Sequence, residues 1–124
     1  SLVRMYMNKN NLVAELSLEY AVRIVNLNNY LRQSKKEFVI SAQIIRSGTS
    51  IGANIAESTM AQSTPDFISK LHIALKEASE TKYWLDLLLR TKYVTDEQYR
   101  SLYKDLRVII GLLVNIVKKV KGED

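Results

Sequence analysis

The sequence contains no cysteine, one histidine, one proline and four glycines in 124 residues. The missing cysteines exclude disulfide bonds, thiolate zinc sites and a cysteine nucleophile. The lone histidine, His72, excludes a metal site built from several histidines. The single proline and the apolar fraction of 47% exclude a proline-rich linker and a disordered chain. We therefore expect one folded domain over residues 1–124, which buries roughly two-thirds of its unfolded surface.

Long apolar runs are also missing. The longest weakly charged segments are 38–56, which contains Arg46 and several polar residues, and 108–117, which is too short for a bilayer that takes about 20 apolar residues to cross. No secretory signal is recognisable near the first residue. We expect a cytoplasmic protein with no membrane partner, in which residues 1–10 are flexible or left over from cloning.

Four start signals divide the remaining chain into helices. Asn10 and Asn11 precede the first helix, and asparagine is a favourable N-cap. Ser34 and Glu37 have the spacing of a capping box, in which the serine hydroxyl accepts from a backbone N–H and the glutamate reaches back. In the segment 63–66 a cap candidate precedes Pro65, which stands at the first helical position. Thr95 begins a second capping box.

Between these signals, apolar residues recur every three or four positions, which is the helical period. No segment shows the sustained polar and apolar alternation of a strand. Because the joints are short, neighbouring helices must run antiparallel. The sequence therefore predicts an all-α, up-down-up-down four-helix bundle, with residues 121–124 frayed and helices over 12–33, 35–62, 65–91 and 96–120.

The apolar residues exceed what one core needs. The main stripe of helix 12–33 consists of Leu12, Leu16, Tyr20, Ile24, Leu27 and Leu31. Further apolar residues on this helix and on helix 96–120 are Val13, Leu18, Val22, Val25, Val108, Ile110, Leu112 and Val117. A bundle takes a stripe about 100° wide from each helix. The surplus favours self-association, although scattered apolar surface is also ordinary.

Helix 35–62 carries small residues on one side and polar residues on the other. Gly48, Gly52 and Ala56 are spaced by four residues. Because each glycine costs about 1 kcal/mol in a helix relative to alanine, the pair predicts close approach of a neighbouring backbone. The opposite side is a polar stripe of Arg46, Ser50, Asn54 and Glu57.

Glu77, Glu80 and Trp84 share one face of helix 65–91. We expect Arg46 to pair with Glu80 or Glu77, within the subunit or across an interface, as a buried ion pair that fixes registry. A ligand-binding or catalytic role for these polar residues is the alternative.

The net charge of +5 is spread along the chain, and no segment forms a basic arm. Candidate phosphate contacts are Lys35, Lys36, Arg100, Lys104, Arg107, Lys118, Lys119 and Lys121. The last three lysines are alternatively explained as favourable charge at a helix C-terminus. Because few aromatic residues are interleaved with these cations, binding to RNA or DNA would be largely sequence-independent and sensitive to salt.

No arrangement of residues indicates catalysis. Di-iron bundles need Glu-x-x-His pairs that face inward, whereas Ser69 stands three residues before His72, which we expect on the surface. A Walker loop is missing, and nothing places serine, histidine and acidic residues together as a triad. We expect no enzyme, no cofactor and no metal.

Residues 42–58, with RSGTSIGANIAES, and residues 66–88, with DFISKLHIALKEASETKYWLDLL, resemble the four-helix-bundle family named for proteins encoded in bacterial 23S rRNA intervening sequences. The likeness covers about residues 12–120 and departs from the family pattern at Ser58 and at Lys76–Glu77. The matching positions are Arg46, Ser50, Ile51, Asn54, Ala56, Glu57, Ala74, Glu80, Thr81, Trp84 and Leu85.

The resemblance implies a closed homopentamer. A related branch of the family supplies accessory proteins of the reverse transcriptases in diversity-generating retroelements, which bind the polymerase and nucleic acid. We therefore expect a non-enzymatic homo-oligomer that associates with RNA or DNA. The alternative is a protein-binding scaffold without nucleic-acid binding, for example a reverse-transcriptase accessory subunit.

Overall fold

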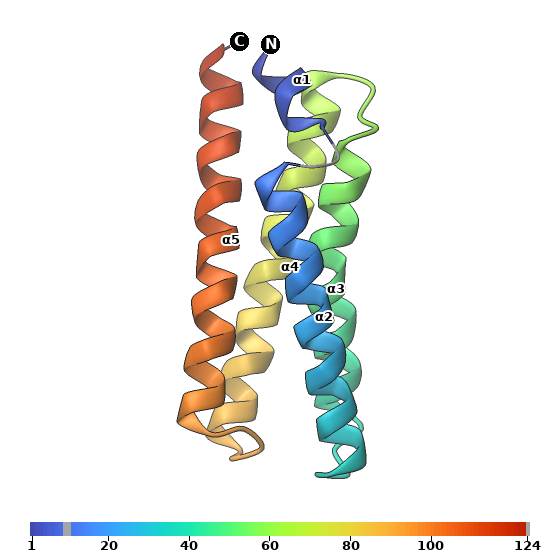
Figure 1. Ribbon diagram of the computed structural model, residues 1–124, viewed down its shortest axis with the longest axis vertical. Helices are drawn as coiled ribbons and strands as arrows, with labels where there is room; N and C mark the ends of the chain where they lie inside the picture. Colours follow the sequence, from blue (N-terminus) through green and yellow to red (C-terminus); the bar gives the residue numbers. More distant parts are fainter. Residues whose placement is uncertain (9–10, 124) are drawn as a thin grey trace.

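The computed structural model describes residues 1–8 and 11–123. Four of its helices are long, and Figure 1 shows them side by side with successive helices running in opposite directions. No strand occurs in the described residues. The predicted all-α bundle is confirmed. The helices are α1 (Leu2–Tyr6), α2 (Leu12–Gln33), α3 (Ile40–Ser58), α4 (Thr64–Arg90) and α5 (Asp96–Glu123).

Three helices begin where the capping signals predict. The side chain of Asn11 accepts a hydrogen bond from the backbone N–H of Ala14 at 2.8 Å, and α2 has the predicted bounds. Ser63 caps α4, and Pro65 lies in its first turn. Before α5, Thr95 Oγ1 accepts from the N–H of Gln98 at 3.1 Å, while Gln98 Oε1 accepts from the N–H of Thr95 at 2.9 Å. This reciprocal pair is a capping box.

The predicted start of α3 is wrong, because α3 begins at Ile40 rather than at residue 35. Ser34 caps the C-terminus of α2 instead of the N-terminus of α3. Lys36 then adopts a left-handed backbone conformation with φ of 54°, so a right-handed helix cannot continue through this residue. The carboxylate of Glu37 accepts from the backbone N–H groups of Val39, Ile40 and Ser41 at 2.7–3.1 Å, so the glutamate caps α3 from outside the helix.

The predicted end of α3 is also wrong, since the helix stops at Ser58 rather than at residue 62. Ser58 Oγ and Thr59 Oγ1 each donate to a backbone carbonyl three residues earlier, Ile55 O and Ala56 O, at 2.6 Å. Such local hydrogen bonds compete with the helical pattern and favour a turn.

The two chain ends carry more helix than the sequence predicts. Residues 2–6 form α1, in a segment expected to be flexible; Ser1 caps it, and it packs against α5. Residues 9 and 10 of that segment lie outside the described residues. At the other end α5 continues to Glu123, beyond the predicted end at residue 120, while Asp124 also lies outside the described residues.

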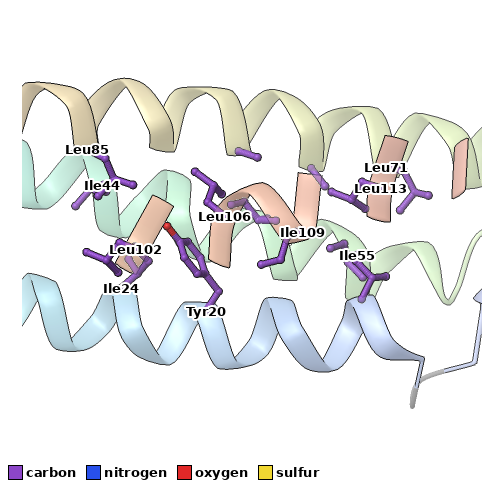
Figure 2. Packing of buried hydrophobic residues seen from close by; sticks show 14 of the residues in the cluster. Tyr20, Ile24, Ile44, Ile55, Leu71, Leu85, Leu102, Leu106, Ile109 and Leu113 are labelled. Atoms are coloured by element: carbon purple, nitrogen blue, oxygen red, sulfur yellow. The ribbon is translucent and has the colours of Figure 1, made fainter. Parts of the chain in front are cut away.

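The core runs along the bundle axis and joins all four long helices (Figure 2). In α2 the inward positions at the first turns are Val13 and Ser17, which are 5% and 1% exposed. Leu12, one residue before Val13, is 62% exposed, so its predicted place in the core is wrong. The inward positions follow one another by four and three residues, and Leu12 lies about 100° off this line. Val13 and Val117 were both predicted as surplus, and both are buried instead.

Close packing of α3 on α2 depends on its two glycines. A Cβ atom at Gly48 would lie 2.8 Å from Ile24 Cγ1, and one at Gly52 would lie 3.3 Å from the backbone oxygen of Ser17. Ala56, the third small residue of the predicted series, is exposed and lines a surface groove instead. The backbone approach expected from the glycine spacing therefore occurs at Gly52, while Gly48 makes room for a buried isoleucine side chain.

Candidate nucleic-acid interface

Five basic side chains line up on one exposed face of α5. They follow one another by four, three, eleven and three residues, each close to a whole number of helical turns, and all are exposed. We call them the α5 basic stripe: Arg100, Lys104, Arg107, Lys118 and Lys121. At a rise of 1.5 Å per residue the stripe is about 32 Å long. Lys119, also predicted as a phosphate contact, lies about 100° around the helix from Lys118.

The α5 basic stripe is not neutralised by neighbouring acids. Within the described residues none of its five side chains forms an ion pair. The acid between its members, Asp105, points to another side of α5 and pairs with Arg23 of α2 at 2.7 Å. Asp96 and Glu97 precede the stripe in the first turn of α5, where they favour the helix N-terminus. Between Arg107 and Lys118 this face carries no cation; Gly111 and Val114, both exposed, lie there instead.

The remaining predicted phosphate contacts lie elsewhere. Lys35 and Lys36 are exposed in the turn between α2 and α3, outside any helix. Figure 1 places this turn and the α4–α5 turn at the same end of the bundle. The structure therefore divides the predicted cations into a stripe along α5 and a small group at one end.

The polar residues of α3 make a network that joins α3 to α4. Arg46 Nη1 lies 3.2 Å from Glu77 Oε2, and Arg46 Nη2 pairs with Glu80. Trp84 Nε1 donates to the same Glu80 oxygen at 2.9 Å. The Arg46 side chain is 49% exposed, which corrects the expectation of a buried pair. Because Arg46 is half exposed to solvent, its ion pairs contribute about 1 kcal/mol or less to the stability of the fold.

The rest of the predicted polar stripe satisfies its hydrogen bonds locally. Ser50 Oγ donates to the backbone oxygen of Arg46 at 2.6 Å, and Asn54 Nδ2 donates to that of Ser50 at 2.8 Å. Glu57 lies 3.4 Å from Lys70 of α4. The ion pairs of Arg46 and Glu57 therefore join α3 to α4.

Several polar contacts between helices have no signal in the sequence. Thr81 Oγ1 of α4 donates to Ser47 Oγ of α3 at 3.0 Å, and both side chains are buried. Arg23 reaches from α2 to α5, where it donates to Ser101 and Asp105. Short polar side chains at inward positions look like breaks in an apolar stripe, and only the three-dimensional pairing shows their role.

An apolar groove runs over the close contact between α2 and α3. It has a volume of about 550 Å³, and small residues form most of its floor, among them Ala14, Ala21, Gly52, Ala53 and Ala56. Leu18 and Met60 stand at its sides and are 62% and 74% exposed. Val22 and Val25 extend this apolar surface along α2, with 55% and 40% of their side chains exposed. The groove is formed because small residues bring the helices together without filling the surface above them.

The described residues offer neither a metal cluster nor a membrane span. Across residues 1–8 and 11–123, no three histidine or carboxylate side chains come together in a way that could hold a metal ion. In the described part of the chain, no helix combines the length and apolarity that crossing a membrane requires.

Comparison with known proteins places the chain in a family. A solved structure, described as a protein with unknown function from the S23 ribosomal protein family of Bacteroides thetaiotaomicron, is 60% identical in sequence. The similarity covers 90% of this chain and 99% of that one, with a TM-score of 0.87. No curated protein matches the chain. The pattern of the 23S rRNA-intervening sequence proteins matches residues 9–115, and the chain therefore belongs to that family.

Proposed function

We propose that this protein is a non-enzymatic nucleic-acid-binding protein that contacts the phosphate backbone of RNA or DNA through the α5 basic stripe. The observation that carries this proposal is the alignment of five exposed cations without ion-pair partners in the described residues. Phosphate contacts of this kind give affinity without reading sequence.

We further propose that the protein acts as a homo-oligomer, a pentamer as the family resemblance implies. The α2–α3 groove and the exposed Leu18, Val22 and Val25 beside it support this part of the proposal, because contiguous apolar surface of this kind marks contact with another protein. Five copies with a net charge of +5 give about +25 per assembly. Such a field concentrates nucleic acid even where each stripe binds weakly.

Binding is tested by fluorescence anisotropy with a blunt-ended RNA duplex at several salt concentrations. If all five cations contact phosphates, the logarithm of the binding constant falls with the logarithm of salt with a slope of about −4.5. Replacing Arg100 and Lys104 by glutamine reduces this slope by about 2. The matched control replaces Lys76 and Arg90 of α4, which are also exposed, and leaves the slope unchanged. No binding at low salt, or an equal effect of both pairs, contradicts the role of the stripe.

Assembly is tested by sedimentation equilibrium. The wild-type protein is expected at about five times the subunit mass of 14.2 kDa, and Leu18→Glu in the groove is expected to yield monomers because it places a charge in the apolar contact. Arg32→Glu, also on α2 but away from the groove, is the control. A wild-type monomer at all concentrations contradicts self-association and leaves the groove to a different protein, as in the scaffold alternative.

A further inference from the structure

Two large apolar side chains in the turn between α2 and α3 are exposed to solvent. Phe38 is 51% exposed and the adjacent Val39 is 73% exposed. A single exposed apolar residue is ordinary, but here two follow one another at the tip of a bundle whose other large apolar residues mostly reach the core. The ring of Phe38 therefore has a surface to offer that the fold itself does not use.

One cation lies over this ring, and two lysines are exposed in the same turn. The guanidinium of Arg32 lies 5.0 Å from the centroid of the Phe38 ring, and Lys35 Nζ lies 5.9 Å from the centroid of Tyr30. Lys36 is exposed in the same turn. Neither Arg32 nor the two lysines take part in an ion pair within the described residues. The α4–α5 turn, at the same end of the bundle in Figure 1, adds exposed Lys92.

The turn is rigidly built, although it lies outside both helices. The backbone N–H of Glu37 donates to Leu31 O at 2.9 Å, and Ser41 Oγ donates to Glu37 O at 2.8 Å. The Glu37 carboxylate is occupied by three backbone N–H groups at the start of α3. Its charge therefore faces the helix end, and Phe38 is presented by a segment that loses little conformational freedom on binding.

We propose that this turn is a stacking site for an unpaired base of RNA or DNA, with the base on the exposed part of the Phe38 ring and the neighbouring phosphates on Lys35 and Lys36. Aromatic rings beside cations are how proteins hold single-stranded nucleic acid, since every base has a flat face to stack and paired bases are out of reach. The site rests on the proposed nucleic-acid binding and adds to it a preference for unpaired segments.

A lipid surface is the other partner that exposed apolar residues and cations fit, and the contacts of Phe38 disfavour it. The Arg32 guanidinium lies against the ring, so insertion of Phe38 into hydrocarbon would draw a charge in with it. Because the guanidinium lies over one face of the ring, a base stacked on the other face leaves it hydrated. The observed pairing therefore favours a base.

The experiment compares binding of a fluorescein-labelled oligouridine and of an RNA duplex of the same length. Phe38→Ala is expected to weaken oligouridine binding roughly tenfold, the loss of one stacked base, while duplex binding changes less than about twofold. Phe38→Trp keeps oligouridine binding because it keeps a ring. Val39→Ala is the matched control, since it removes an exposed apolar side chain from the same turn without removing a ring, and it is expected to change neither. Melting temperatures of all variants verify that they fold.

The outcomes separate the two proposals. If neither RNA binds the wild-type protein, both the stripe and the turn are wrong. If the Arg100 and Lys104 substitutions weaken both RNAs while Phe38→Ala weakens neither, the stripe stands and the stacking site is overturned. The third outcome concerns vesicles of equal parts phosphatidylcholine and phosphatidylglycerol. If they bind the wild-type protein but not the Phe38→Ala variant, and oligouridine binding is the same for both, the turn is a membrane contact and the proposal is overturned.

Discussion

Helix α2 meets its two neighbours in different ways. Against α3 it packs closely, with Gly48 and Gly52 of α3 facing Ile24 and Ser17 of α2. Against α5 it packs less extensively, and two surface pockets of about 190 and 250 Å³ lie along that seam. Small residues set the distance between α2 and α3, because they let a backbone approach where a larger side chain would otherwise stand. Large residues and long polar side chains span the wider seam between α2 and α5.

Two residues of α2 show what the wider seam requires. The Arg23 guanidinium donates to Ser101 and Asp105 of α5 and so bridges the gap from its solvent side. Tyr20 points from α2 into the core cluster that includes Leu106 (Figure 2). It is 2% exposed, and its hydroxyl has no hydrogen-bond partner among the described residues. Burial raises the pKa of Tyr20 far above its ordinary value, so the hydroxyl stays neutral.

The largest effect is expected at the close seam. Gly48→Ala should lower the free energy of unfolding by about 1–3 kcal/mol, because the new methyl group overlaps a buried, β-branched side chain. The clash outweighs the gain of about 1 kcal/mol in helix propensity that alanine brings. Urea unfolding monitored by circular dichroism measures the change.

Gly111→Ala in α5 is the matched control for this substitution. Because a Cβ atom at Gly111 would meet nothing within 4 Å, the substitution should raise the free energy of unfolding by about 0.5–1 kcal/mol. If both alanines stabilise the protein, close packing is not what requires glycine at position 48. In the Gly48→Ala background, Ile24→Ala should lower the free energy of unfolding by less than it does in the wild-type protein, because it removes the side chain that clashes.

An intermediate effect is expected at the turn that joins α2 to α3. Burial favours the neutral form of Glu37, but hydrogen bonds from the backbone N–H groups of Ile40, Ser41 and Val39 outweigh this and hold its pKa below the ordinary value of 4.5. Because the folded pKa is the lower one, the stabilisation is complete above the ordinary pKa and is lost as the pH falls through the folded value. Glu37→Gln should cost about 0.5–2 kcal/mol at neutral pH, as the loss of a helix cap does.

This difference has a defined pH dependence. The gap in unfolding free energy between the wild-type protein and Glu37→Gln should narrow as the pH falls from neutral to about 3, which is below the ordinary pKa of glutamate. Unfolding curves at the two pH values measure it. A gap that is the same at both would show that the charge of Glu37 does not stabilise the start of α3.

The smallest effect is expected at the wider seam. Tyr20→Phe should leave the free energy of unfolding unchanged or raise it by up to about 1 kcal/mol, because it removes a buried hydroxyl that has no partner in the described chain. Tyr99→Phe is the matched control: the Tyr99 hydroxyl donates to Asp86 Oδ1 at 2.5 Å, and its loss should cost about 1 kcal/mol. If Tyr20→Phe costs as much as Tyr99→Phe, the Tyr20 hydroxyl is hydrogen-bonded in solution and the seam is better satisfied than its contacts indicate.

The sequence predicts the helices well where their ends depend on local chemistry. Asn11, Ser63 and Thr95 each cap a helix through a side chain within a few residues, and such signals are visible in the sequence alone. It fails at Ser34, because the same residue type can end one helix or begin the next. The left-handed backbone of Lys36 decides between them, and a lysine gives no sign of it.

The candidate sites were predictable in part for a related reason. Periodicity along α5 brings its cations together without any knowledge of packing, so the stripe follows from spacing alone once the helix is known. The pairing of Arg46 with α4 was expected, but its exposure depends on how deeply two helices interlock. Phe38 was missed because a phenylalanine in an apolar segment is ordinarily a core residue, and only the late start of α3 leaves it in the turn.

The arrangement of the α2–α5 seam also bears on how the chain folds. The other seams between long helices join neighbours in the chain through short connections, which favours fast folding. The bond between Arg23 and Asp105 closes a separation of 82 residues, and among the seams between long helices this one carries the largest loop-closure entropy cost. We therefore expect α2, α3 and α4 to associate first and α5 to close onto α2 last. Opening would begin at the same seam, so the helix that carries the basic stripe would also be the first to detach.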